Sequence, residues 1–389
     1  MMQHIQNLET PAILVRQDIL TQNMQKYQSE CDKYGKKLWP MVKTHKASAF
    51  CKMQQEIGAD GFLCGTLDEC EALCEKGFQN IMYAYPAAGT ISCSRIAKLA
   101  SKCNFYVRLD SIESAGMLDE AAARFNANTA AADGTGSPDV SAPVTISYTL
   151  IIDCGLHRFG IAPENAAVFA DQLKQFEHLR FAGISTHSGH VYGEADPDKI
   201  AIYAQDEQNA LHTAAAVLEK AGYEIQLVTT GATPTFRYAV ADPCINIYHP
   251  GNYVFHDAIQ IGNRTATEEE CALSVYATVI AHPAGDLFIC DAGAKCLGLD
   301  QGAHGNASVK GYGYVIGHPE LTVCGLSEEV GKLHVDGITD LKIGDRIRII
   351  PNHACSSANL TDYYIMVNEQ DQVTEWIPVD IRGNKTRKI

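Results

Sequence analysis

Short apolar runs alternate with amphipathic stretches over roughly the first 255 residues of the chain. In the amphipathic stretches, such as Leu67–Lys76 and Ala201–Ala221, apolar residues recur three and four positions apart, which is typical of helices with one buried face. The apolar runs have the length of buried strands: Ala12–Val15, Leu38–Val42, Gly61–Cys64, Ile81–Tyr83, Phe105–Leu109, Ser147–Ile152, Phe181–Thr186 and Gln226–Thr229. A strand followed by a helix, repeated about eight times, predicts a parallel (β/α)8 barrel of the TIM type over residues 12–258. The competing architecture is an open, doubly wound sheet, and the polar residues at the strand ends favour the barrel.

The pattern changes after about residue 260, where short β-rich runs follow one another with few convincing helices. This pattern predicts a smaller all-β domain over residues 259–389, joined by residues 1–11. Its strand candidates are Ala272–Ile280, Leu287–Asp291, Glu320–Cys324, Arg346–Ile350 and Tyr363–Val367. Within the first domain, residues 125–142 are small and polar without periodicity, so we expect an exposed loop there.

Composition and charge narrow the classes of partner. A chain of 389 residues with 46% hydrophobic and 20% charged residues is ordinary for a two-domain globular protein. The formal charge of -15 argues against nucleic acid or an anionic membrane as partner, although backbone N–H groups can still bind a phosphate locally. Residues 1–8 lack a signal-peptide pattern and no apolar run approaches the ~20 residues of a membrane span. We therefore expect a cytoplasmic protein whose 14 cysteines are reduced thiols.

A lysine follows the second predicted strand directly, in the segment Val42-Lys43-Thr44-His45-Lys46. Barrel enzymes place their active sites at the C-terminal ends of the strands, so Lys43 is a candidate nucleophile or base. A surface lysine at a strand end is the alternative, and on this segment alone it is the more common case.

Two further polar segments follow predicted strands of the barrel. In Asp153-Cys154-Gly155-Leu156-His157-Arg158-Phe159-Gly160, a glycine turn presents Arg158, which can pair with an anionic oxygen of a ligand or form a structural salt bridge. In Ser185-Thr186-His187-Ser188-Gly189-His190-Val191-Tyr192, the candidates are His187 and Tyr192, although each singly could be a satisfied core residue.

Two glycine turns have the composition of phosphate sites. Thr230, Gly231 and Thr233 follow one predicted strand, and Gly251 and Asn252 lie in the turn His249-Pro250-Gly251-Asn252-Tyr253. Phosphate sites in barrels usually lie in the loops after strands seven and eight, where free backbone N–H groups converge. Either turn alone is weak support, because such sequences also form ordinary turns.

A possible metal pair lies in the predicted β domain, in Pro351-Asn352-His353-Ala354-Cys355. In a strand, His353 and Cys355 would point to the same side, and imidazole with thiolate suits zinc, with water or substrate completing the coordination. Two ligands are a weak motif, and an incidental His and Cys is about equally compatible with the spacing.

Together these segments resemble the fold-type III pyridoxal-phosphate enzymes, in the branch that contains D-threonine aldolase and eukaryotic-type D-serine dehydratase. The resemblance runs over nearly the whole chain, from Glu9-Thr10-Pro11 to the β domain. It implies an alanine racemase-like barrel, a cofactor imine on Lys43, the arginine turn at Arg158, phosphate binding by the two glycine turns and a divalent metal on His353 and Cys355. Zinc is the first expectation for that metal, followed by manganese or magnesium.

The chain departs from the branch at three points. Met41 stands where a histidine often precedes the Val-Lys step, Val330 follows Glu328-Glu329 where a histidine is frequent, and His249 stands where an arginine often precedes the Pro-Gly turn. By this resemblance, these positions lie on the side of the site that faces the substrate and on the side that faces the ring nitrogen of the cofactor.

The resemblance implies a lyase of small β-hydroxy D-amino acids, acting as a homodimer. In this branch His-x-Cys goes with dehydration and His-x-Asp with aldol cleavage, so a D-serine- or D-threonine-type dehydratase that yields a keto acid and ammonia is the first expectation. Retro-aldol cleavage to glycine and an aldehyde is the second. A racemase, with Tyr312 or Tyr314 as second base, is the third, and a non-catalytic pyridoxal-phosphate carrier is the fourth.

Overall fold

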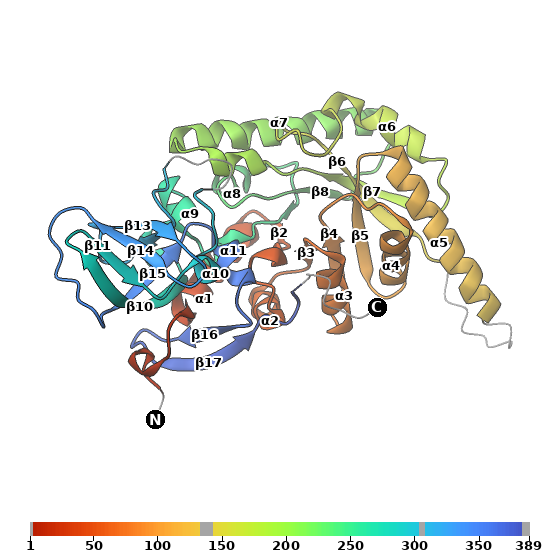
Figure 1. Ribbon diagram of the computed structural model, residues 1–389. Coiled ribbons are helices and arrows are strands. Elements are labelled where there is room, and N and C mark those ends of the chain that lie inside the picture. The colour runs from red at the N-terminus through yellow and green to blue at the C-terminus, as the bar shows by residue number, and fades with distance from the viewer. Residues whose placement is uncertain (1–2, 133–142, 303–307, 383–389) are drawn as a thin grey trace.

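The computed structural model describes residues 3–132, 143–302 and 308–382, and two β-sheets organise this part of the chain (Figure 1). One sheet is entirely parallel, with the strand order β2-β9-β8-β7-β6-β5-β4-β3. Its strands are β2 (Lys37–Leu38), β3 (Phe62–Cys64), β4 (Asn80–Tyr83), β5 (Asn104–Leu109), β6 (Ile146–Ile151), β7 (Leu179–Ser185), β8 (Leu227–Thr230) and β9 (Ile247–Tyr248).

The parallel sheet closes on itself between its two end strands, β2 and β3. Met41, just beyond β2, forms a parallel bridge with Leu63 of β3, and the Leu63 N–H donates to the Pro40 carbonyl at 2.9 Å. These bonds satisfy backbone groups that an open sheet would leave at its edges. The predicted barrel is therefore confirmed, and the open sheet is not formed.

Helices lie around the outside of the barrel (Figure 1). In α3, for example, Leu67, Cys70 and Leu73 are buried, and the Thr66 side chain caps the first turn by accepting from the Glu69 N–H at 3.2 Å. Among the described helices, none combines the length and apolar character needed to cross a bilayer. The helices of this region are α1 (Gln17–Lys33), α2 (Ser48–Ile57), α3 (Leu67–Glu75), α4 (Thr90–Ala100), α5 (Ile112–Ala132), α6 (Ala166–Leu173), α7 (Pro197–Lys220), α8 (Phe236–Ala239) and α9 (Ala258–Gly262).

The first predicted barrel strand belongs to the other sheet. β1 (Ala12–Arg16) pairs antiparallel with β10 and parallel with β16, so assigning it to the barrel was wrong. An apolar run shows that a strand is buried but not which sheet provides its hydrogen bonds. The eighth barrel strand is β9, a two-residue strand too short to be recognised from its pattern.

The second sheet is mostly antiparallel, as predicted for an all-β domain, and lies to one side of the barrel (Figure 1). Its central path runs β13-β14-β11-β10-β1-β16-β17, and β15 pairs with both β10 and β12. Two short helices, α10 (Ala294–Leu297) and α11 (Ala354–Asn359), accompany it. Its other strands are β10 (Leu273–Ala284), β11 (Leu287–Cys290), β12 (Gly313–Val315), β13 (Leu321–Leu326), β14 (Gly331–Val335), β15 (Arg346–Pro351), β16 (Tyr363–Val367) and β17 (Val373–Pro378).

The loop expected over residues 125–142 begins later than its composition suggested. Helix α5 continues to Ala132, and the Asn126 side chain exchanges hydrogen bonds with the backbone of Val144 at 2.8 and 3.1 Å. Alanine is the best helix former, so the alanine-rich segment extends the preceding helix. Residues 133–142 lie outside the described residues.

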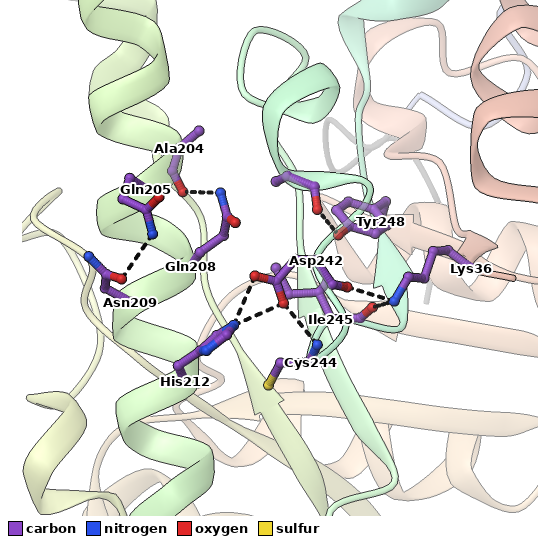
Figure 2. A network of polar contacts seen from close by, with 11 residues as sticks. Lys36, Ala204, Gln205, Gln208, Asn209, His212, Asp242, Cys244, Ile245 and Tyr248 are labelled. Atoms are coloured by element: carbon purple, nitrogen blue, oxygen red, sulfur yellow. Dashed lines mark hydrogen bonds and ion pairs between the residues drawn. The ribbon is translucent and has the colours of Figure 1, made fainter. Parts of the chain in front are cut away.

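The connection between α8 and β9 is anchored to its neighbours by polar contacts (Figure 2). His212 of α7 contacts both carboxylate oxygens of Asp242, at 2.8 and 2.9 Å. Lys36, just before β2, donates to the backbone carbonyls of Asp242 and Ile245 at 2.6 and 2.7 Å. These contacts hold the start of β9 between β8 and β2, and thereby fix the register of the glycine turn that follows β9.

Candidate active site

A cavity of about 910 Å³, its open mouth included, lies where the parallel strands end. This end of a barrel is where active sites form. All eight barrel strands contribute to its lining through residues at or just beyond their C-terminal ends: Lys43, Leu63, Tyr85, Arg108, Arg158, His187, Gly231 and Gly251. His353 and Cys355 complete the lining from the second sheet.

Lys43 enters the cavity from a 3-10 turn, η2 (Val42–Thr44), rather than from a strand end. Two glycines leave room for this turn. A Cβ on Gly65 would lie 3.2 Å from the Lys43 Cβ, and a Cβ on Gly251 would lie 2.9 Å from the Thr44 Oγ1. Lys43 is half-buried and, in the part of the chain that the structure describes, makes no hydrogen bond or ion pair. Its amine is therefore left available for chemistry.

A buried ion pair lies directly behind this turn. The Lys46 Nζ is 3.4 Å from Glu69 Oε1, and the other Glu69 oxygen accepts from the Gly65 N–H at 2.6 Å. Burial raises the pKa of the Glu69 carboxyl above its ordinary value even though Lys46 pulls it down. Glu69 thus connects the Lys43 turn to the end of β3.

His187 connects β7 to the first glycine turn. Its Nδ1 lies 2.5 Å from the Gly231 carbonyl oxygen, so Nδ1 carries the proton and donates it. Burial, helped by the charge of Lys43, lowers the pKa of His187 to about 3, so the ring is neutral at physiological pH. The neutral ring therefore leaves Nε2 as a hydrogen-bond acceptor.

Arg158 lies on a turn that hydrogen bonds between neighbouring residues stabilise. The Asp153 carboxylate accepts from the backbone N–H groups of Gly155 and His157, at 3.0 and 3.1 Å. The Arg158 guanidinium is exposed and lies over the Tyr85 ring, 5.8 Å from its centroid. It can therefore pair with an anionic group entering the mouth of the cavity.

The two glycine turns approach each other closely. A Cβ on Gly231 would lie 2.4 Å from the backbone of His249, a distance that excludes any side chain. His249 Nδ1 lies 2.8 Å from the Trp39 carbonyl, while His249 Nε2 and Asn252 Oδ1 are buried with no protein partner among the described residues. These unsatisfied polar atoms at a glycine-rich wall indicate a site that a polar ligand completes.

His353 and Cys355 lie together, but not in a strand as expected. β15 ends at Pro351, His353 is the N-cap of α11, and Cys355 lies in its first turn, because the backbone turns into the helix after Asn352. The Cys355 Sγ is 3.3 Å from the Thr44 Oγ1, so the pair lies against the Lys43 turn.

The charges around this pair favour a thiolate. Burial opposes ionisation of Cys355, but the adjacent His353 lowers the pKa of that thiol below its ordinary value. Asp300 lies 3.6 Å from His353 Nδ1, and Asp257 accepts from the Ala354 N–H at 3.0 Å. Among the described residues, no group of three His, Cys, Asp or Glu side chains is arranged to hold a metal ion.

Most of the residues singled out in the sequence line this one cavity: Lys43, Arg158, His187, Tyr192, Gly231, Gly251, Asn252, His353 and Cys355. Thr230 and Thr233 are not among its lining residues. The Thr230 hydroxyl donates to the buried carboxyl of Glu207 on α7, behind the turn, and the Thr233 N–H donates to the Tyr192 hydroxyl at 3.1 Å.

Sequence reasoning missed four polar residues that also line the cavity: Tyr85, Arg108, Asp257 and Gln260. Arg108 had a visible signal, because it is a charged residue inside the otherwise apolar strand Phe105–Leu109. Asp257 and Gln260 follow the second glycine turn in a stretch without strand or helix periodicity, so no local pattern distinguishes them.

Comparisons with known proteins cover almost the whole chain. Residues 15–258 match the family model described as alanine racemase, N-terminal domain, and residues 272–367 match the putative serine dehydratase domain. A D-serine dehydratase of Dictyostelium discoideum is 28% identical over 399 residues, spanning 96% of this chain and 97% of the relative.

Two solved structures are similar throughout. The D-threonine aldolase of Filomicrobium marinum superposes with a TM-score of 0.85 at 26% identity, covering 97% of this chain and 96% of that one. A cysteine-to-alanine variant of D-threo-3-hydroxyaspartate dehydratase, described as being in the metal-free form, gives a TM-score of 0.83 at 27% identity, covering 97% and 99% of the two chains.

Proposed function

This chain belongs to the alanine racemase N-terminal domain family, and on that premise we propose its reaction: dehydration of a small β-hydroxy D-amino acid to a keto acid and ammonia. The resemblance carried by its motifs is confirmed, since its relatives are pyridoxal-phosphate-dependent dehydratases and aldolases. The chain is accordingly a lyase that acts on β-hydroxy D-amino acids. The observation that carries the finer proposal is the position of Cys355, 3.3 Å from the residue after Lys43.

The cavity fits pyridoxal phosphate. It offers an unpaired lysine amine and, lining the same space, two glycine turns with buried polar atoms that lack protein partners among the described residues. We propose that Lys43 holds the aldehyde carbon, that Gly231, Gly251 and Asn252 hold the phosphate, with Thr230 and Thr233 shaping the turn, and that Arg158, His187 and Tyr192 contact the rest of the cofactor. When bound, the cofactor stabilises negative charge at the substrate α-carbon.

The residues of the chain have separate roles in this reaction. Once the substrate amine has replaced it on the aldehyde carbon, the freed Lys43 Nζ would be the base that accepts the α-proton. The neutral His187 ring keeps its Nε2 as an acceptor while Gly231 fixes its tautomer. Besides contacting the cofactor, the forked guanidinium of Arg158 can also pair with the substrate carboxylate at the mouth of the cavity.

We propose that His353 and Cys355 hold a divalent metal ion, zinc in the first place and otherwise manganese or magnesium. The donor set fits, because the Cys355 pKa is lowered and its sulfur faces the Lys43 turn. A metal held there would supply Lewis-acid activation of the β-hydroxyl. The relative whose cysteine-to-alanine variant is described as metal-free supports this assignment.

Retro-aldol cleavage is the second candidate, favoured by the similarity to the solved D-threonine aldolase. Keto-acid and aldehyde release from D-serine, D-threonine and 3-hydroxy-D-aspartate, measured with and without EDTA, separates the two. Keto acid that disappears with EDTA supports dehydration. Glycine and an aldehyde from D-threonine, without keto acid, would contradict it.

Racemisation and cofactor carriage have less support. Tyr312 and Tyr314, the candidate second bases of a racemase, are not among the cavity's lining residues in this chain. A carrier would not need the metal pair.

We further propose that residues 12–258 form one domain, that residues 259–389 with 1–11 form the other, and that the protein is a cytoplasmic homodimer. The two family matches support the domain division, although β1 hydrogen-bonds to the second sheet.

A further inference from the structure

We propose that Arg108 is an anion-binding residue at the floor of the cavity, and that it makes the enzyme selective for β-hydroxy D-amino acids with a second carboxylate on the β-carbon. This inference rests on the proposed function and names the substrate class of the same site.

Arg108 is buried without a carboxylate. It lies on β5, lines the cavity and is only 5% exposed. Its contacts are long and weak: Nε to the Met82 sulfur at 3.4 Å, and one terminal nitrogen to the Thr229 Oγ1, across the barrel on β8, at 3.5 Å. Within the described ranges, no acidic side chain forms an ion pair with it. By contrast, the half-buried Arg95 contacts both Asp68 and Glu71, at 2.6 and 2.7 Å.

A buried guanidinium needs acceptors. It presents five N–H donors, and removing its charge from water is costly unless a partner replaces the lost hydration. Burial lowers the pKa of Arg108 only to about 10, so the group remains charged at neutral pH. An anionic group that enters the cavity is the partner that this side chain lacks.

The cavity's two remaining anion sites are already assigned. The glycine turns take the cofactor phosphate, and Arg158 at the mouth takes the substrate α-carboxylate. Arg108 and Arg158 both line this cavity, and Arg158 lies over the ring of Tyr85, which lines it too. A substrate with one carboxylate would leave Arg108 unpaired, whereas a second carboxylate on the β-carbon would neutralise it.

The test measures binding of unreactive probes to the holoenzyme by calorimetry. D-malate and D-lactate both lack the amine and differ by one carboxylate. We expect the wild-type protein to bind D-malate about 10–100-fold more tightly, the range of one charge-assisted hydrogen bond. Arg108→Gln should reduce this ratio to within about twofold. Arg180→Gln is the matched control, because it removes the same charge from an exposed position outside the cavity.

Several outcomes would overturn the proposal. One is an unchanged malate-to-lactate ratio in folded Arg108→Gln. Another is a changed cofactor absorption spectrum in Arg108→Gln with an unchanged malate-to-lactate ratio, which would show that Arg108 faces the cofactor instead. If Arg108→Gln does not fold, Arg108→Met removes the charge and leaves a flexible apolar side chain in its place, and a ratio as high as in the wild type would contradict the proposal. Strong malate preference in a protein without turnover of any β-hydroxy D-amino acid would retain this anion site and reject the proposed reaction.

Discussion

The buried ion pair behind Lys43 allows a sharp prediction about stability. Glu69 is fully buried, Lys46 is 11% exposed, and their charged atoms lie 3.4 Å apart. At an effective dielectric constant of about 20, their attraction is about 5 kcal/mol, whereas removing each ion from water costs several kcal/mol. The raised pKa of Glu69 shows that burial outweighs the attraction of Lys46. The pair as a whole should therefore add little net stability.

Removing only one partner should have a much larger effect. Glu69→Gln leaves the Lys46 ammonium buried without a counter-charge and weakens the acceptor of the Gly65 N–H. We expect a loss of about 3–5 kcal/mol in the free energy of unfolding, equivalent to a fall in Tm of roughly 4–6 °C for a chain of this length. Replacing both residues, as Glu69→Gln with Lys46→Met, should recover most of that loss.

Urea unfolding followed by circular dichroism, with the thermal midpoint as a second measurement, compares the two single variants, the double variant and the wild type. Lys52→Met, which breaks the exposed pair with Glu56 at 3.9 Å, is the control and should change stability by less than about 1 kcal/mol. A double variant as unstable as Glu69→Gln would refute the reasoning, because it would show that the pair itself stabilises the fold.

Three further predictions concern the cavity. Lys43→Met should abolish covalent trapping of the cofactor by borohydride, measured by mass spectrometry, and trapping at another lysine would contradict the assignment. In Gly251→Ala the added Cβ should press against Thr44 and displace the Lys43 turn, which should weaken cofactor binding by at least about tenfold in a fluorescence titration. Gly285→Ala is the control, because its added Cβ meets nothing, and it should leave cofactor binding unchanged. Glu207 is buried, and burial raises its pKa from 4.5 to about 7. The Glu207 carboxyl therefore holds its proton more tightly in the folded state than in the unfolded state. This difference stabilises the folded state at pH 4.5, and the stabilisation is lost, by up to about 3 kcal/mol, as the pH rises from 4.5 to 7. The free energy of unfolding, measured across that pH range, should fall less steeply in Glu207→Gln than in the wild type. An unchanged dependence on pH would exclude Glu207 as the source of the fall.

The alternation of apolar runs and amphipathic stretches was enough to predict the barrel and the β domain. Each βα unit is a local pattern, and right-handed crossovers leave few ways to arrange eight of them. The same pattern placed Lys43, Arg158, His187 and the glycine turns at strand ends, and because the strands are parallel, their ends meet at one mouth.

Pairing between distant segments could not be predicted in this way. β1 joined the second sheet, and the two-residue β9 took the last barrel position, because hydrogen-bond partners are chosen by the whole fold and not by one run. His353 and Cys355 were recognised as a pair, but their place against Thr44 depends on how the second sheet docks on the barrel.

What the sequence determined by itself was therefore a partial inventory: most of the barrel strands, the family and many of the residues that line the cavity. Only the tertiary structure decided which of those side chains lack partners. Arg108 is charged in any conformation, but it becomes a binding residue because the closed barrel surrounds it, among the described residues, with a thioether, a hydroxyl and no carboxylate. Burial and partnership are properties of the assembled fold, and they determine whether a polar residue supports the structure or binds a ligand.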